Sequence, residues 1–150
     1  MTEATVEQRI RQLEDIEAIK AVTRCYAHAV NKGPNGKGLD LAAIPQIFTP
    51  GARWSSDELG TVIGATAIAA ELPTATAMVE FSMQAFLNPV ITVYGDTATG
   101  SWLLWIASVL DHRPGAAYLS ADLSYLRTAA GWCIDSVQVH DGIRIPAPLA

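Results

Sequence analysis

The sequence predicts an α+β domain in which helices come first and a run of long antiparallel strands follows. Two observations predict it. Apolar residues recur at steps of three and four over residues 16–31, which is typical of a helix. After residue 80 the chain alternates side chains of different polarity between short turns rich in Gly, Asp and Asn. Helices on one face of a curved sheet would enclose an apolar pocket.

Composition narrows the classes of protein. The chain has 150 residues, of which 50% are hydrophobic and 17% charged, with a net charge of −5. It is interpreted as one domain, 1–150, that buries roughly 70% of its unfolded surface. The scattered basic residues argue against nucleic acid as a partner. The apolar excess predicts an internal cavity or a subunit interface, so we expect a homodimer that binds a small hydrophobic molecule.

Location follows from the termini and the cysteines. Residues 1–15 are polar, and the densest apolar run, 102–107, is too short to cross a bilayer, so neither a signal peptide nor a membrane partner is expected. Cys25 and Cys133 have no metal or redox spacing and are interpreted as buried free thiols. Together these features predict a cytoplasmic protein.

Two helices are predicted at the start. Residues 3–14 form a short leading helix with its own apolar face, and Asp15 caps a second helix after a bend. Gly33-Pro34 ends that second helix, and the leading helix is expected to pack on a second subunit. The second helix carries a stripe of one phenol among mostly apolar groups: Ile16, Ile19, Thr23, Tyr26 and Val30.

The middle of the chain is predicted to be a loop, a short helix and a hairpin. Residues 32–38, KGPNGKG, form a loop without the spacing of a Walker phosphate loop. Asp40 caps a short helix that carries Leu41, Ile44 and Phe48. Residues 52–56, with Trp54 at their centre, pair with 61–63, and a helix over 66–72 is stopped by Pro73.

Four long strands complete the core fold, about 15–141. Residues 80–93 are predicted to contain a bulge or an edge position at Asn88-Pro89. Residues 97–110 are apolar on both faces, which predicts a strand covered on both sides. Residues 116–127 place Tyr118, Ser120, Asp122 and Ser124 on one face. The last strand, 132–140, ends at Asp141-Gly142, and 142–150 form a tail.

Several stretches resemble a known family. They are DIEAIKAVTRCYAHAVN, LDLAAIPQIFTPGARW, GATAIAAEL, NPVITVYGDTATG and GWCIDSV, in that order. They are typical of SnoaL-like domains, in the superfamily named for nuclear transport factor two, whose members include ketosteroid isomerase, scytalone dehydratase, lindane dehydrochlorinase and bile-acid dehydratase. The resemblance covers residues 12–140. It implies a cone-shaped barrel, a curved antiparallel (mixed) sheet wrapped around N-terminal helices, usually dimeric through its outer face.

The dehydratase-like members imply a site that this chain matches in part. They carry a tyrosine on the first helix, which is Tyr26 here. Their aspartate and histidine positions correspond to Asn31 and Gln84. Neither amide can act as a base near neutral pH, so the Asp–His dyad of that chemistry is absent, although both amides can hydrogen-bond a substrate.

Ketosteroid isomerase implies a second template. Tyr26 and a protonated Asp122 would form an oxyanion hole, and Asp57, next to Ser56, would supply the base through a one-residue bulge. A buried Asp122 would have a raised pKa and could donate a hydrogen bond. The alternative is that the face of Asp122 is simply solvated.

The candidate catalytic residues are therefore Tyr26, Asp122, Asn31 and Gln84. His28 and His112 are expected at the surface, whereas His140 is expected at the pocket or its mouth. No spacing of ligands predicts a metal, and no cofactor is expected. The residues expected to bind substrate are Trp54, Asp57, Phe86, Asn88, Trp105, Tyr118 and His140.

Three functions remain open from the sequence. The first is a small cofactor-independent lyase, isomerase or cyclase that acts on a polycyclic, terpenoid or polyketide-like compound. The second is a non-catalytic binding or accessory module, which the missing dyad favours. The third is an interaction protein that docks through its outer sheet. A carboxylate buried in the pocket would favour the first function, and a neutral pocket the second.

Overall fold

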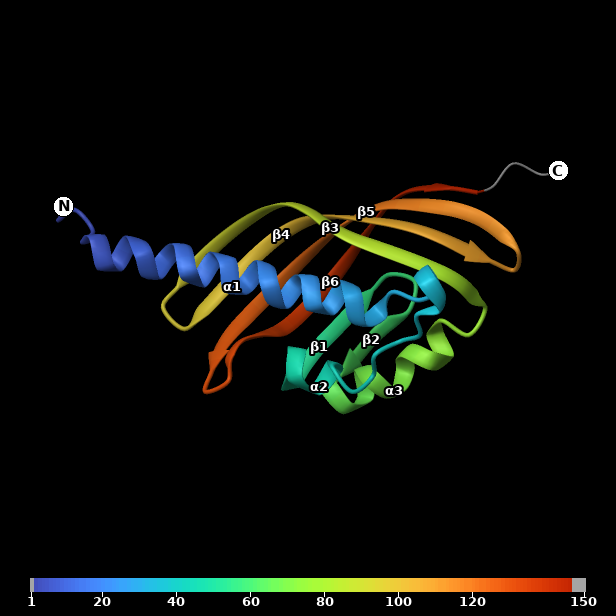
Figure 1. Cartoon of the computed structure of the whole chain (residues 1–150), viewed down its shortest axis with the longest axis horizontal. Coiled ribbons are helices and arrows are strands. Elements are labelled where there is room, and N and C mark those ends of the chain that lie inside the picture. Colours follow the sequence, from blue (N-terminus) through green and yellow to red (C-terminus); the bar gives the residue numbers. More distant parts are fainter. Residues whose placement is uncertain (1, 147–150) are drawn as a thin grey trace.

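The computed structural model describes residues 2–146 as three α-helices and one six-stranded sheet. The strand order is β2-β1-β6-β5-β4-β3, with β1 and β6 parallel and the other neighbours antiparallel. The sheet curves around α1, which confirms the predicted α+β class (Figure 1). It is an open sheet with β2 and β3 at its edges, so the curved sheet does not close into a barrel. The elements are α1 (Val6–Val30), a 3-10 turn (Pro34–Gly36), α2 (Ile44–Ile47), β1 (Phe48–Ser56), β2 (Gly60–Ile63), α3 (Ala65–Ala75), β3 (Val79–Tyr94), β4 (Thr97–Leu110), β5 (Arg113–Thr128) and β6 (Gly131–Ile145).

The first helix is continuous, so the predicted bend after a leading helix over 3–14 is wrong. No Gly or Pro interrupts residues 6–30, and a change of apolar face does not by itself break a helix. Thr5 begins α1 with a capping box, in which Gln8 N donates to Thr5 Oγ1 and Thr5 N donates to Gln8 Oε1. The first turns project beyond the sheet (Figure 1), which leaves their apolar groups exposed: Val6, Ile10 and Leu13.

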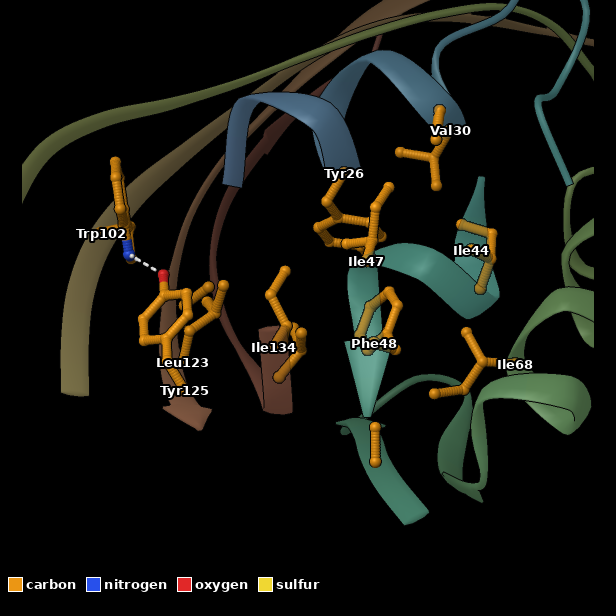
Figure 2. Packing of buried hydrophobic residues seen from close by; sticks show 14 of the residues in the cluster. Tyr26, Val30, Ile44, Ile47, Phe48, Ile68, Trp102, Leu123, Tyr125 and Ile134 are labelled. Carbon is orange, nitrogen blue, oxygen red and sulfur yellow. Dashed lines mark hydrogen bonds between the residues drawn. The ribbon is translucent and has the colours of Figure 1, made fainter. Parts of the chain in front are cut away.

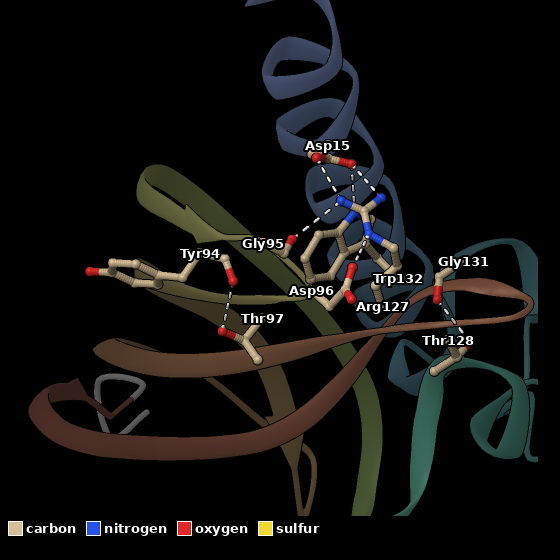
Figure 3. Close-up of polar contacts among 9 residues, drawn as sticks. All are labelled: Asp15, Tyr94, Gly95, Asp96, Thr97, Arg127, Thr128, Gly131 and Trp132. Atoms are coloured by element: carbon tan, nitrogen blue, oxygen red, sulfur yellow. Dashed lines mark hydrogen bonds and ion pairs between the residues drawn. The ribbon is translucent and has the colours of Figure 1, made fainter. Parts of the chain in front are cut away.

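Asp15 is buried in the middle of α1 instead of capping a helix. Its two carboxylate oxygens accept hydrogen bonds of 2.8 Å each from Arg127, and Oδ1 also accepts one of 3.0 Å from Trp132 Nε1 (Figure 3). The Arg127 guanidinium lies 4.6 Å above the Trp132 ring and also bonds Asp96. One side chain of the helix is thereby tied to β5, β6 and the turn between β3 and β4.

The core lies between α1, α2, α3 and the inner face of the sheet (Figure 2). The predicted stripe of α1 faces inward: Ile19, Thr23, Tyr26 and Val30 are buried and Ile16 is half-buried. Inner residues of β5 alternate as predicted, with Leu119, Ala121, Leu123 and Tyr125 buried. Cys133 is buried as expected, whereas Cys25 is exposed on α1.

Several element ends differ from the predictions. Pro73 lies inside α3, which continues to Ala75, and Phe48 begins β1 instead of ending a helix. β6 passes through Asp141-Gly142 to Ile145, since Ile143 pairs with Tyr118 of β5. The predicted bulge is confirmed: the register of β3 shifts between Leu87 and Val90, and Asn88 has φ +48°.

The two faces of β4 differ in burial. Its bounds agree with the prediction, and Trp102 and Leu104 are buried on the inner face. Leu103 and Trp105 point outward and remain 39% and 47% exposed, so no described part of the chain covers the outer face as the sequence predicted. None of the helices described over residues 2–146 is long and apolar enough to cross a membrane.

We predict that Asp15→Asn destabilises the protein by about 1–3 kcal/mol at pH 7, because it weakens the pair with Arg127. The hydrogen bond from Arg127 is the largest cause of the lowered pKa of Asp15. A lowered pKa stabilises the fold above the ordinary value of 3.8, and this stability disappears as pH falls through the folded-state value. The difference in the free energy of unfolding between variant and wild type, measured by urea unfolding, should therefore be smaller at pH 3 than at pH 7.

The matched control is Glu17→Gln, on the same helix but in an exposed pair with Lys20. It should leave the free energy of unfolding nearly unchanged, because an ion pair between exposed side chains contributes little to stability. A difference for Asp15→Asn as small as that of the control would contradict the anchoring role of Asp15.

Candidate functional site

An apolar cavity of about 210 Å³ lies between the end of α1, α3 and the inner face of the sheet. Its inner wall consists largely of aliphatic side chains from these elements: Val30, Val62, Ile68, Leu72, Leu104, Ile106, Leu119, Val137 and Val139. The polar and charged lining residues near the β1–β2 turn, α3 and the far end of β6 are more exposed. We therefore place the mouth of the cavity at those three segments.

Tyr26 supplies a phenol to this apolar wall. Its side chain is only 5% exposed and its ring contacts Phe48 and Phe86, with centroids at 5.1 and 5.8 Å. Trp54 Nε1 donates to the Tyr26 hydroxyl at 3.0 Å. Burial raises the pKa of Tyr26 to about 12, so the phenol is neutral at physiological pH and has a proton to donate.

A second buried tyrosine, Tyr125, has a hydroxyl that both accepts and donates a hydrogen bond within the protein. The Tyr125 hydroxyl accepts from Trp102 Nε1 at 3.0 Å and lies 2.8 Å from Thr23 Oγ1 (Figure 2 shows the first bond). The single hydroxyl proton of Thr23 goes to the Ile19 carbonyl at 2.8 Å. Tyr125 must therefore donate to Thr23, which completes a chain of three bonds.

The Tyr26 phenol also accepts a hydrogen bond from a tryptophan, Trp54. Unlike Tyr125, it has no acceptor for its own proton among residues 2–146. Its O–H, polarised by the bond that Trp54 donates, is therefore available to a molecule in the cavity. The comparison with Tyr125 separates a structural tyrosine from one that can bind a ligand.

The two amides at the dyad positions have different roles. Asn31 is the C-cap of α1 and is buried, and its Oδ1 accepts from Gln84 N on β3 at 2.7 Å. This bond fixes the end of the helix to the sheet, and the Asn31 side chain is absent from the cavity lining. The Gln84 side chain lines the cavity. Of the two predicted hydrogen-bonding amides, the structure thus places one in the site.

Asp122 lies on the outer face of the sheet with its side chain 58% exposed. Ser101 Oγ donates to it at 2.7 Å and His140 Nε2 lies 2.8 Å from its other oxygen. The hydrogen bond from Ser101, then that with His140, lowers the pKa of Asp122. The predicted raised pKa and oxyanion-hole role are wrong, because this polar row faces solvent.

His140 also lies on the outer face, which corrects its predicted place at the pocket. The register of β6 against β5 shifts between the Ser124–Ser136 and Tyr125–Ile134 pairs, so Asp135 is an extra residue. The bulge reverses which side chains point inward, and Val137 and Val139 line the cavity instead of their neighbours.

The other predicted binding residues divide into two groups. Trp54, Asp57 and Phe86 line the cavity. Trp105 and Tyr118 do not, because they contact each other on the outer face with centroids at 5.3 Å, and Asn88 is exposed in the β3 bulge. Sequence reasoning missed these lining residues: Ser56, Glu58, Leu59, Glu71, Thr76, Asp141 and Arg144.

The mouth carries most of the charge of the site. Arg144 Nη2 donates to Glu58 at 3.0 Å and to Asp141 at 2.9 Å, which joins the β1–β2 turn to the end of β6. The alternation of Ile143, Arg144 and Ile145 was the sequence signal for this part of β6. No three His, Cys, Asp or Glu side chains in the described range, 2–146, could hold a metal ion together.

We predict that stability falls as pH rises from 10 to 12, because burial raises the pKa of Tyr26 and of Tyr125 to about 12 from an ordinary value of 10. A raised pKa stabilises the fold fully below pH 10, and this stability is lost as pH rises through 12. Urea unfolding of Tyr26→Phe and Tyr125→Phe should show a smaller alkaline loss than wild type. Tyr94→Phe, an exposed control, should retain the full loss.

Comparisons with known proteins identify relatives of this arrangement. A family model described as a SnoaL-like domain matches residues 11–138. A comparison with curated protein sequences finds no match.

Solved structures share the fold at low identity. A candidate aromatic ring hydroxylase from Novosphingobium aromaticivorans is 23% identical, with a TM-score of 0.78 over 90% of this chain and 94% of that chain. Hexachlorocyclohexane dehydrochlorinase LinA-type3 from Novosphingobium barchaimii is 14% identical, with a TM-score of 0.81 over 95% and 96%. A protein of Novosphingobium aromaticivorans described as like nuclear transport factor two is 21% identical, with a TM-score of 0.72 over 92% and 90%. These likenesses show the fold alone.

Proposed function

This chain belongs to the SnoaL-like domain family, and we propose that it is a small cofactor-independent enzyme of the lyase or isomerase type. Its substrate would be a hydrophobic ring compound that carries an oxygen. The observation that carries the proposal is Tyr26, which lines an apolar cavity and whose hydroxyl accepts from Trp54 but donates to no residue among 2–146. A carbonyl or hydroxyl oxygen is the group that would accept it.

The size of the cavity limits the part of the substrate that it encloses. An engineered cavity of about 150 Å³ holds benzene, so about 210 Å³ suits one or two fused rings. A larger polycyclic, terpenoid or polyketide-like compound would extend through the mouth. Trp54 and Phe86 offer flat aromatic surfaces to such rings.

Asp57 is the base that we propose. It lines the cavity at the end of β1 beside Ser56, and it takes no part in the ion pairs that engage Glu58 and Asp141. In the proposed reaction Asp57 removes a proton from the carbon next to a carbonyl group. The negative charge moves to the carbonyl oxygen, which Tyr26 stabilises by donating its hydrogen bond. Return of the proton to another carbon of the conjugated enolate gives an isomer, as in an isomerase. Departure of a leaving group from the β carbon with its electron pair gives an α,β-double bond, as in a lyase.

A specific observation favours a second candidate, a non-catalytic binding module. The inner wall of the cavity is neutral, and the side-chain oxygen of Asn31 accepts a hydrogen bond from the backbone of β3. The dyad positions of the family thus supply no base here. The same pocket would then hold a hydrophobic molecule without changing it.

We predict that 2-acetylnaphthalene binds in the cavity and that Tyr26→Phe weakens binding about 5- to 10-fold, the value of one hydrogen bond. Isothermal titration calorimetry measures the dissociation constant. Tyr125→Phe is the matched control, because it removes a buried phenol that also accepts from a tryptophan but lies outside the cavity. Equal weakening by both variants would contradict the role of Tyr26.

The same compound separates the two candidate functions. An enzyme with Asp57 as base should speed exchange of the acetyl methyl protons in D₂O, as followed by NMR, and Asp57→Asn should abolish the increase while binding persists. Glu71→Gln, at the same mouth, should retain it. Binding of the compound without exchange by wild type would overturn the enzyme proposal and favour the binding module.

We also propose that a second copy covers the outer face of the sheet. Six apolar side chains of neighbouring strands lie side by side there, and Trp105 packs against Tyr118. An apolar face of this kind is typical of subunit interfaces. The residues are Met83, Leu87, Leu103, Trp105, Tyr118 and Ile143.

We predict a homodimer in sedimentation at micromolar concentration and a monomer for Trp105→Lys, because a charge in the centre of the face would be desolvated on association. Ile63→Lys is the control, since Ile63 is exposed on β2, at the opposite edge of the sheet from β3 and β4. A monomeric wild type would contradict the proposal.

The free thiols support a cytoplasmic location for this protein. Cys25 and Cys133 form no disulfide, and Cys25 is exposed to the solvent. Reduced thiols are typical of the cytoplasm.

A further inference from the structure

We propose that the mouth of the cavity selects its ligand by charge. It admits a hydrophobic oxygen compound whose outer end is neutral or carries a protonated amine, and it rejects a compound that carries a carboxylate. This inference rests on the proposed function, because it names the class of molecule that the same cavity takes.

The charges that line the mouth are mostly negative. Four carboxylates and one guanidinium belong to the lining, which leaves three negative charges in excess. They come from the β1–β2 turn, α3 and the end of β6, so they surround the opening: Asp57, Glu58, Glu71, Asp141 and Arg144. Every other lining residue is neutral. Charges of one sign beside apolar walls raise the local concentration of the opposite charge.

The one guanidinium is already engaged. Arg144 donates to Glu58 and to Asp141, so two carboxylates already neutralise its one positive charge and leave one negative charge over. A ligand carboxylate would have to compete with both of them. The remaining two acidic residues, Asp57 and Glu71, form no ion pair within residues 2–146 and are free to attract an ammonium group.

The inner end of the cavity also opposes a carboxylate. The Tyr26 O–H is one neutral donor, and Gln84 adds one amide. An ionised carboxylate loses its water when it enters an apolar cavity, and two neutral groups do not replace that hydration. A neutral carbonyl oxygen loses less hydration and can accept from Tyr26. Both ends of the cavity therefore favour a neutral inner group and a neutral or cationic outer group.

Three probes that share one ring system test the inference. They are 2-acetylnaphthalenes with a methyl, an aminomethyl or a carboxylate group at position 6, titrated into the whole chain by calorimetry at pH 7. We expect the ammonium compound to bind about tenfold more tightly than the carboxylate at low ionic strength, and the difference to shrink in about 0.5 M salt. The dissociation constant of the methyl compound should change little with salt.

A matched pair of variants assigns the effect to the mouth. Asp57→Asn combined with Glu71→Gln removes two negative charges without disturbing the pairs of Arg144, and it should cut the preference to about threefold or less. Glu3→Gln combined with Asp111→Asn removes the same charge from residues outside the lining, and it should leave the preference intact.

The outcomes separate this inference from the proposed function. If the methyl compound does not bind, the proposed function itself fails. If that compound binds but the two charged compounds bind equally, or the carboxylate binds more tightly, the charge selection is overturned. A control pair that reduces the preference as much as the mouth pair would also overturn it, because net charge would then explain the preference.

Discussion

The position of α1 over the sheet depends on one buried charged side chain, that of Asp15 in the middle of the helix. Asp15 is satisfied only where Arg127 and Trp132 can reach it, so the ion pair sets how the helix lies across β5 and β6. Tyr26 follows Asp15 by 11 residues, close to three turns, and therefore points to the same side. At the other end of the helix, Asn31 bonds the backbone of β3. Two polar anchors thus hold the apolar stripe between them, and with it the phenol of the cavity.

Much of the fold was predictable from the sequence because its signals are local. The stripe of α1, both ends of β4, the bulge of β3 and the alternation of β5 follow from periodicity and turn residues. The continuous first helix was missed because its exposed turns carry apolar groups without a partner. The end of β6 was missed because only pairing with β5 carries the strand past Gly142.

The site was less predictable, since alternation separates two faces of a strand but does not tell which one is inside. Tyr26, Trp54, Gln84 and Phe86 lie in the cavity, because their neighbours on the same face are apolar. Asp122 and His140 lie outside for the opposite reason, and for His140 one extra residue in β6 decided the side. The mouth depends on contacts between segments more than 80 residues apart in the chain, such as Arg144 with Glu58. A local sequence pattern does not predict a contact of this kind.

The bond between Asn31 and β3 has a consequence for how this fold changes over time. An aspartate at position 31 would present the same acceptor oxygen to the backbone N–H of residue 84, so the helix end would stay in place. The side chain at position 84 already faces the cavity, where an imidazole would also lie. Substitutions at positions 31 and 84 would therefore place a carboxylate at the end of the helix and an imidazole at the wall of the cavity. The bond that fixes the end of the helix therefore does not depend on whether residue 31 carries an amide or a carboxylate, so the fold and the chemistry at this position can change separately.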